Sequence, residues 1–357
     1  MTDTIWILGA SDPEMEAIES LLRECGQTVM HAAINGVRVH PGNAYRADTS
    51  DVPDGARLIT VECGFAVTHS VNLAIDHHAP GHPGFGRPPA EFMPATSLGQ
   101  VIRELANVSG SEYGPLGAWA SPPRLAQAPE WGRICHAASV GWCVAVAGHA
   151  SGKYGSGLYA RWVVIPERTV LIAAADHCLG AAYRGECPGV NPTALVVFRA
   201  EERARFQRRP VAEVLADIES TTDALAGAPM PIVAAKCRAC GGNGSRQSVL
   251  LSSAPWLSHR AECSIHRGSY EGVDVADMRR ATPWPELPEA ATRAGLGYIS
   301  GPLTSPDGRS KFTVSGTAEQ VGAWLDYWAP ANGIVDTYGD PARGFAGGYA
   351  SREYTET

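Results

Sequence analysis

An aspartate followed by two adjacent histidines, Asp76-His77-His78, is the segment of this sequence best suited to chemistry. It follows the uncharged run from Val71 to Ile75, whose β-branched residues are typical of a buried strand. Carboxylate and imidazole groups together are common ligands of metal ions. We therefore predict a metal cluster at the carboxyl end of a strand, where open α/β sheets bind ligands. Two surface histidines at a strand end are the alternative.

Further acidic residues follow other predicted strands, namely Asp12, Glu14 and Glu16 after the first, Glu62 after the second and Asp176 after a later one. Parallel strands end at the same edge of a sheet, so these carboxylates are expected close to the triplet. They would repel one another unless a divalent cation neutralised them. Oxygen with imidazole ligation suits manganese, and also magnesium, iron or zinc. The alternative is a helix N-cap with acids favoured by the helix dipole, plus strand-end acids facing solvent.

The elements that must position these residues alternate between strand-like and helix-like segments, which predicts an α/β fold with a mostly parallel sheet. Between the first two strands a helix is predicted over residues 13–25, with Asp12 as N-cap, Pro13 as first helical residue and Gly26 as its stop. The predicted strands are Thr4–Leu8, Arg57–Val61, Val71–Ile75, Val140–Ala147, Arg161–Ile165 and Thr169–Ala175.

Composition limits the class of protein. A chain of 357 residues predicts two domains, and 45% hydrophobic with 18% charged residues is typical of a soluble globular protein. The net charge of -8 argues against a surface that coats long nucleic acids. No signal-like leader or membrane-length apolar stretch is present, and nine irregularly spaced cysteines favour thiols or metal ligands over disulfides. We expect a cytoplasmic protein.

Four segments resemble, in order, the motifs of the DHH phosphoesterase superfamily: Asp12-Pro-Glu-Met-Glu16, Val61-Glu-Cys-Gly64, Ile75-Asp-His-His78 and Ala174-Ala-Asp176. Residues 95–105 also resemble the helix that follows the triplet in that family. The resemblance covers about the first half of the chain. It implies a two-domain phosphohydrolase that uses a pair of divalent metals, commonly manganese, to activate water against a phosphodiester or pyrophosphate.

The first two motifs depart from the family pattern. The family has His-x-Asp-Pro-Asp-x-Asp, whereas this chain has Ala10-Ser-Asp-Pro-Glu-Met-Glu16, and Glu62 replaces the aspartate of the second motif. A glutamate reaches one methylene further than an aspartate, so ligation stays feasible with shifted metal positions. Two other hypotheses stay open, a non-catalytic ligand-binding or partner-binding protein that retains the fold, and other chemistry at the same metal rim.

If the resemblance holds, the catalytic residues are Asp76, His77 and His78. Asp76 is expected to bridge or anchor metal, His77 to ligate or contact phosphate, and His78 to ligate or to orient its neighbour. The metals would lower the pKa of a bound water and stabilise charge on the phosphoryl oxygens. The complete predicted ligand set is Asp12, Glu14, Glu62, Asp76, His77, His78 and Asp176.

Substrate contacts are predicted at four basic residues, His149, Lys153, Arg184 and Arg343. His149 and Lys153 lie in Gly148–Gly157, which is one residue short of a P-loop and is better explained as a hairpin. Arg184 follows Asp176, within a segment where His177 and Cys178 also pack locally in the alternative view. The glycine-rich residues 344–350 resemble the phosphate-contacting loop of the family's second domain, although a simple turn is the better explanation.

A second metal site is predicted at Cys237-Arg-Ala-Cys240 and Cys263-Ser-Ile-His266. The two-residue spacing within each pair lets it chelate one side of a tetrahedral Zn²⁺. Structural zinc would brace a glycine- and serine-rich segment with few apolar residues. Free thiols with a surface histidine are the alternative.

The predicted organisation is therefore a metal-binding catalytic domain (1–200), a helical connector (201–232), a candidate zinc-binding insert (233–272) and a smaller α+β substrate-binding domain (273–357). In the last domain a strand is expected at Lys311–Val314 and a helix over Ala318–Trp328, with Val321, Leu325 and Trp328 inward. The expected substrate is a small nucleotide-like molecule or a short oligonucleotide. No membrane or long duplex partner is expected, and a homo-oligomer is compatible with the sequence.

Overall fold

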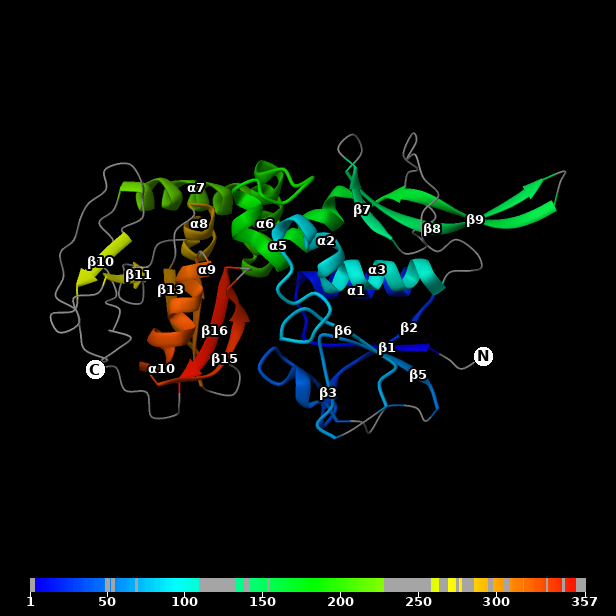
Figure 1. Cartoon of the computed structure of the whole chain (residues 1–357), viewed down its shortest axis with the longest axis horizontal. Helices are drawn as coiled ribbons and strands as arrows, with labels where there is room; N and C mark the ends of the chain where they lie inside the picture. The colour runs from blue at the N-terminus through cyan, green and yellow to red at the C-terminus, as the bar shows by residue number, and fades with distance from the viewer. Residues whose placement is uncertain are drawn as a thin grey trace. The chain divides into compact units, whose positions relative to one another are not determined.

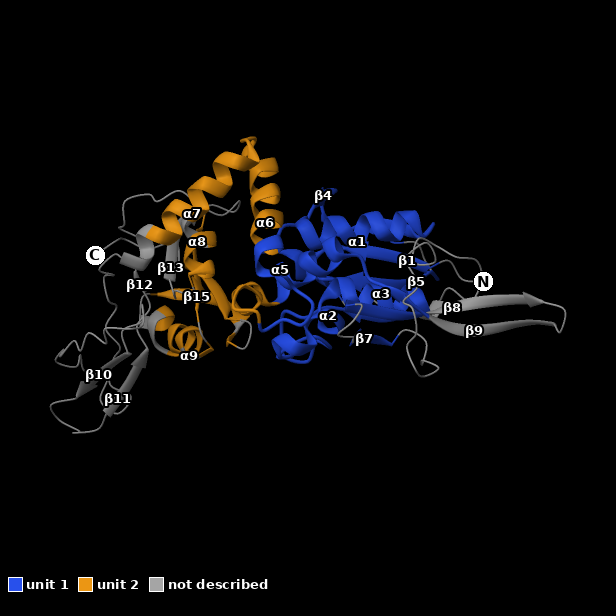
Figure 2. Ribbon diagram, turned by 90° about the horizontal axis from the view of Figure 1, so that it is seen from above, with its two compact units in different colours: residues 1–177, 186–194 blue, residues 178–185, 195–357 orange. Residues whose placement is uncertain are grey.

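The computed structural model describes residues 4–48, 52, 55–67, 70–108, 133–137, 141–152, 155–227, 258–262, 269–273, 276–277, 286–294, 298–304, 309–316, 318–331, 333–341 and 344–350. The chain divides into two compact units (Figure 2), unit 1 with residues 1–177 and 186–194 and unit 2 with residues 178–185 and 195–357. Residues 178–185 and 195–200, predicted as part of the first domain, thus fall in unit 2.

Unit 1 is built on a four-stranded parallel sheet with the order β2-β1-β5-β6 (Figure 1). Three of its strands, β1 (Thr4–Leu8), β5 (Arg57–Val61) and β6 (Leu73–Ile75), were predicted, whereas β2 (Thr28–His31) was not. The α/β class and the parallel sheet are confirmed. A DHH-type fold stays a prediction.

Helix α1 (Pro13–Glu24) follows β1 as predicted. The side chain of Asp12 caps it by accepting a hydrogen bond from the Met15 N–H, and Pro13 occupies its first turn. The backbone of Gly26 is left-handed (φ +67°) just beyond its end. Helix α1 packs beside α3 (Ser97–Val108), which follows η2 (Pro89–Glu91) and α2 (Phe92–Ala95).

The strands alternate their side chains between two buried faces, as the period of a strand requires. Ile5 and Ile7 pack in one cluster with Val39 and Leu58, so one face is covered by the segment after β2. That segment contains β3 (Ala33–Ile34), β4 (Val37–Arg38) and η1 (Ala44–Arg46). The alternation places Trp6 and Leu8, which are also buried, on the opposite face. Helices α1 and α3 lie on the other side of the strands from β3 (Figure 1). With both faces covered, ligands can reach this sheet at its edges and strand ends.

The strands predicted over Val140–Ala147 and Arg161–Ile165 exist, but they do not extend the parallel sheet. They belong to β8 (Gly141–Gly152) and β9 (Gly155–Val164), which form an antiparallel sheet with β7 (Ile134–Ala137). Pairing continues to Gly152 opposite Gly155, so the glycine-rich stretch is a hairpin as expected, and not a phosphate loop.

The predicted strand Thr169–Ala175 is wrong, because these residues lie inside helix α5 (Glu167–Tyr183). Short apolar runs do not distinguish a buried strand from a buried helix, and the alanines here favour the helix. Cys178 departs from helical geometry (φ -152°, ψ 44°) and interrupts α5 where unit 1 passes into unit 2. Asp176 therefore comes from the last turn of α5 before this break, and not from a strand end.

Unit 2 contains α6 (Pro192–Gln207) from Leu195 onward, α7 (Val211–Gly227), α8 (Leu287–Arg293) and a five-stranded sheet, β12-β13-β14-β16-β15. The strands are β12 (Ala276–Asp277), β13 (Tyr298–Thr304), β14 (Ser310–Ser315), β15 (Ile334–Asp340) and β16 (Phe345–Ala350). A separate hairpin pairs β10 (Ser258–Glu262) with β11 (Ser269–Val273). All pairs of the five-stranded sheet are antiparallel except β12 with β13.

The strand predicted in this unit is confirmed, whereas the predicted helix and the turn predicted near the carboxyl terminus need correction. The helix is divided into α9 (Ala318–Ala323), a π turn η3 (Trp324–Trp328) and α10 (Ala329–Ala331), so Trp324 joins Val321 in the core cluster with Leu325 beside it. The side chain of Trp328 lies outside the described residues. Residues 345–350 form a central strand, and not a turn or loop, because their glycines allow close approach of β15.

Candidate metal centre

The centre lies in unit 1, where the ends of β5 and β6 meet the first turn of α1 and the last unit 1 turn of α5. Glu14, in the first turn of α1, is buried. Its Oε1 accepts a hydrogen bond from the backbone N–H of Leu98 at 2.9 Å. Its Oε2 has no hydrogen-bond partner among the described residues. A buried, ionised carboxylate oxygen without a donor is costly, and either a proton or a cation at this oxygen would remove that cost.

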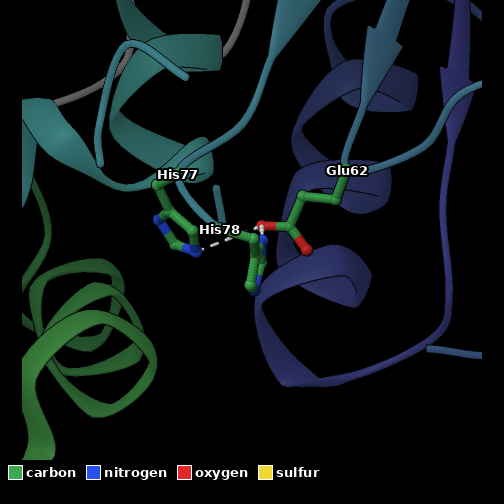
Figure 3. A group of neighbouring side chains, drawn as sticks. All are labelled: Glu62, His77 and His78. Atoms are coloured by element: carbon green, nitrogen blue, oxygen red, sulfur yellow. Dashed lines mark ion pairs between the residues drawn. The ribbon is translucent and has the colours of Figure 1, made fainter. Parts of the chain in front are cut away.

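Glu62 follows β5 in a left-handed backbone conformation, with φ +52°. Such strain is uncommon for a residue with a long side chain and is concentrated at functional sites. The N–H of Glu62 donates to the carbonyl oxygen of Ile75, which fixes the residue beside the end of β6. The conformation directs the buried carboxylate toward the two histidines (Figure 3), and within the described part of the chain Oε1 makes no hydrogen bond.

His77 lies at the middle of this group and is fully buried. Its Nε2 is 3.0 Å from Asp176 Oδ2 and 3.5 Å from Glu62 Oε1. Neither contact is aligned as a hydrogen bond, and both ring nitrogens lack such a partner among the described residues. Ligand atoms of Glu14, His77 and Asp176 lie within 4.8 Å of one another, as do those of Glu62, His77 and His78. Of these ligand atoms, His77 Nε2 and Glu62 Oε1 lack hydrogen bonds among the described residues, and each of the two groups could hold a metal ion.

The loop after the triplet brings His77 against the helices. A Cβ atom at Gly84 would lie 1.9 Å from the carbonyl oxygen of Ala95 and 2.6 Å from the Cβ of His77. Only glycine allows this approach. The side-chain amide of Gln100 donates to the carbonyl oxygens of Asp76 and Ala95, which ties the same loop to α3. The imidazole of His77 therefore has little freedom to turn away from the carboxylates.

Asp76 belongs to neither of the two groups of candidate ligands, and its predicted metal contact stays a prediction. Its Oδ1 accepts hydrogen bonds from the backbone N–H of His77 and from the backbone N–H and Nδ1 of His78, at 2.7, 3.0 and 3.0 Å. Its Oδ2 accepts a hydrogen bond from the Tyr45 hydroxyl at 2.8 Å. Asp76 thus organises the turn that presents the histidines, while the converging ligand atoms belong to other residues.

The electrostatics separate the two kinds of carboxylate. Burial, together with the nearby charges of Glu62 and Asp176, raises the pKa of Asp12 to about 8. Burial and the same two neighbours raise the pKa of Glu14 well above its usual value. For Asp76, burial opposes ionisation, but hydrogen bonds from His78 and Tyr45 outweigh it and lower the pKa. Carboxyls with raised pKa values lose protons when a cation binds, so binding of a metal here would release protons.

The remaining predicted residues are placed as follows. His149 lies in β8, and Arg184 follows α5 within unit 2. Outside the described residues lie Lys153, Arg343 and the predicted zinc ligands Cys237, Cys240, Cys263 and His266.

The sequence did not indicate Tyr45 or His82 as site residues. The hydroxyl of Tyr45 and Nδ1 of His82 both lie close to the carboxylate of Asp76. Tyr45 is far from the triplet in sequence and carries no motif, so no local signal pointed to it. His82 lies in the loop after the triplet, and its imidazole was the available signal.

The donor set could hold a divalent cation, because three carboxylates and an imidazole are mixed oxygen and nitrogen ligands and several of their buried atoms lack hydrogen bonds among the described residues. Comparison with models of protein families, with curated proteins and with solved structures finds no match to this chain.

Proposed function

We propose that unit 1 is a metal-dependent phosphohydrolase of the phosphodiesterase or pyrophosphatase type. The observation that carries the proposal is the convergence of His77 Nε2 with unbonded, buried oxygens of Glu14 and Glu62 beside Asp176. These four residues would hold the cation, with Asp12 close enough to influence their charge. When bound, a divalent metal supplies an activated water and stabilises negative charge on phosphoryl oxygens.

His78 is suited to contact the substrate. Its side chain is 40% exposed, unlike that of His77, and its Nδ1 donates to the ionised Asp76. That hydrogen bond leaves Nε2 as the nitrogen that can contact a phosphoryl oxygen or, when protonated, give a proton to a leaving group. In this proposal His77 binds the cation, whereas His78 orients the substrate and gives a proton to the leaving group.

The proposed substrate is a small nucleotide-like molecule or a short oligonucleotide. The resemblance to the DHH superfamily suggests the nucleotide part. The acidic chain, with a net charge of -8, favours a small substrate over long nucleic acid. No helix in the described part of the chain is long and apolar enough to cross a membrane. We also propose Mn²⁺ as the working metal, with Mg²⁺ as the alternative, and Zn²⁺ at the cysteine cluster.

The test is release of product from bis(p-nitrophenyl) phosphate, pyrophosphate and short dinucleotides by protein treated with EDTA and then titrated with Mn²⁺. The proposal predicts hydrolysis of at least one compound with Mn²⁺ and none in EDTA, and loss of that activity in His77→Gln. Glu91→Gln is the matched control, because Glu91 is exposed and pairs only with Arg87 among the interactions the structure gives. Mn²⁺ binding without hydrolysis of any of the three substrates would contradict it.

A non-catalytic binding protein is the second candidate. The observation that favours it is Ala10, which is buried after β1 and has no ligating group where the DHH motif has histidine. This candidate predicts Mn²⁺ binding that stabilises the protein, tight nucleotide binding and no turnover. Calorimetric nucleotide titration of the Mn²⁺-loaded protein, followed by analysis of the recovered nucleotide, distinguishes the two.

A further inference from the structure

We propose that Tyr45 is a positioning residue, which acts through Asp76 to hold the imidazole of His78 in the orientation that presents Nε2. The effect on rate rests on the proposed function, whereas the effect on the His78 ring can be measured without any activity. Nothing in the motif pattern involves Tyr45. The proposal comes from a chain of hydrogen bonds that joins two distant parts of the sequence.

Both hydrogen bonds are accepted by one carboxylate, that of Asp76. The Tyr45 hydroxyl donates to Asp76 Oδ2 at 2.8 Å, and Asp76 Oδ1 accepts from His78 Nδ1 at 3.0 Å. A carboxylate whose second oxygen is held cannot rotate freely about its Cβ–Cγ bond. The hydroxyl of Tyr45 therefore fixes the plane of the acceptor that fixes the histidine, as the outer partners of metal-site and catalytic histidines do.

The backbone around Tyr45 is fixed next to the metal centre. The N–H of Gly64 donates to the carbonyl oxygen of Ala44, and the N–H of Ala47 donates to the carbonyl oxygen of Gly64. Both alanines are buried. Gly64 follows Glu62 by two residues, so the segment that carries Tyr45 is tied to the same strand end that carries a candidate ligand.

The hydrogen bond of its hydroxyl holds the side chain of Tyr45 more than burial of its ring does. Tyr45 is 44% exposed, so its contribution to the apolar core is small. The ring of His82 lies 6.2 Å away at an interplanar angle of 28°, and a Cβ atom at Gly64 would lie 3.6 Å from Tyr45 Cδ1. The ring is thus flanked by two neighbours while its oxygen is directed at Asp76. Removing the hydroxyl alone should free the carboxylate and leave the fold intact.

His82 does not replace Tyr45 in this role. Its Nδ1 is 3.0 Å from Asp76 Oδ1, but the same nitrogen accepts the N–H of Ala79 at 3.1 Å. A neutral imidazole nitrogen that accepts one hydrogen bond has no proton to donate to a carboxylate. The donor that the structure gives to Oδ2 is the Tyr45 hydroxyl.

The test compares Tyr45→Phe with Tyr338→Phe. Tyr338, in unit 2, carries a hydroxyl that is buried and has no hydrogen-bond partner among the described residues, so its removal is the matched control. The first readout is the ¹⁵N NMR signature of His78 in EDTA-treated protein at a pH of about 8, where ordinary imidazoles are neutral. The signal is assigned with His78→Gln.

We expect wild type and Tyr338→Phe to populate the Nδ1-protonated tautomer of His78, and Tyr45→Phe to show a mixture of both tautomers. In the Mn²⁺-loaded enzyme, kcat of Tyr45→Phe should fall about tenfold, the effect of losing one hydrogen bond to a charged group. KM and the Kd for Mn²⁺ should stay within about twofold, because no ligand is removed.

An unchanged His78 tautomer in Tyr45→Phe would overturn the proposal, whatever the rate. A tenfold loss of Mn²⁺ affinity would also overturn it, because Tyr45 would then act on the metal ligands. If the Mn²⁺-loaded wild type hydrolyses no substrate, the proposed function fails, and the tautomer alone still decides whether Tyr45 positions His78.

Discussion

Replacing Glu14 by glutamine should stabilise the metal-free protein and abolish its stabilisation by Mn²⁺. The substitution keeps the size of the side chain and the acceptor for the Leu98 N–H, and it removes the charge from the oxygen that has no donor. The new amide can donate to the carboxylates of Asp176 or Glu62, which raise the pKa of Glu14 in the wild type. An ordinary buried carboxylate with satisfied hydrogen bonds would respond in the opposite direction.

The magnitude follows from burial. At pH 8 the wild-type carboxyl either stays ionised without a donor or retains a proton that the unfolded chain releases, and both lower the free energy of unfolding. A buried polar group without a partner costs about 2 kcal/mol. For a domain of this size that corresponds to a rise in Tm of about 4–8 °C. Wild type at Mn²⁺ concentrations of about 100 times Kd should gain ~2.7 kcal/mol, and the variant should gain almost none.

Urea unfolding in EDTA measures the stability of the metal-free variant, and thermal unfolding with and without Mn²⁺ measures the stabilisation by the metal. Glu91→Gln removes an exposed carboxylate of the same type and should change the free energy of unfolding by less than about 0.5 kcal/mol. A Glu14→Gln variant that is less stable than wild type in EDTA, and still stabilised by Mn²⁺, would refute the reasoning. Glu14 would then be a structural acceptor for Leu98 alone.

Three further perturbations test the same centre. Because burial and neighbouring charges raise the pKa of Asp12 to about 8, its contribution to the stability of metal-free protein is present below pH ~4 and lost as pH rises toward 8, whereas stabilisation by Mn²⁺ grows. Thermal unfolding at pH 6, 7 and 8 should show this opposite trend, and parallel changes would contradict it. Asp76→Asn should lower the free energy of unfolding by ~2–4 kcal/mol in urea titrations, because Asp76 supports the turn. The Kd for Mn²⁺ should change only a few-fold, because Asp76 lies outside the ligand groups. Loss of Mn²⁺ binding in a folded variant would show that Asp76 is a ligand. Gly84→Ala should weaken Mn²⁺ binding at least tenfold by displacing the loop of His77. The control Gly322→Ala lies in a helix with open space around it and should leave Mn²⁺ binding unchanged. Calorimetry with Mn²⁺ compares the two variants, and equal affinities would contradict the prediction by showing that the loop adapts.

The sequence predicted the elements whose signals are local. Asp12 and Pro13 specify the start of α1, and the apolar residues of β1 and β5 specify buried strands, so the parallel sheet and the positions of Glu14, Glu62 and His77 could be anticipated. These residues meet because parallel strands end together. No long-range information was needed.

The errors arose where tertiary contacts decide. The apolar run Thr169–Ala175 satisfies a strand and a helix equally well, so Asp176 was assigned to the wrong kind of element although it does reach His77. Residues 345–350 were expected as a turn, yet their glycines admit a neighbouring strand. The hydrogen bond from Tyr45 to Asp76 joins residues that are remote in sequence, and Tyr45 carries no recognisable motif, so no local signal indicated it.

The central claim is that His77 and its carboxylate neighbours bind a divalent cation. The most direct measurement is equilibrium dialysis of EDTA-treated protein against Mn²⁺, followed by elemental analysis, for wild type and His77→Gln. The account predicts at least one equivalent of Mn²⁺ retained by wild type and lost from a folded His77→Gln variant. Wild-type protein that retains no Mn²⁺, or a variant that retains as much as wild type, would contradict it.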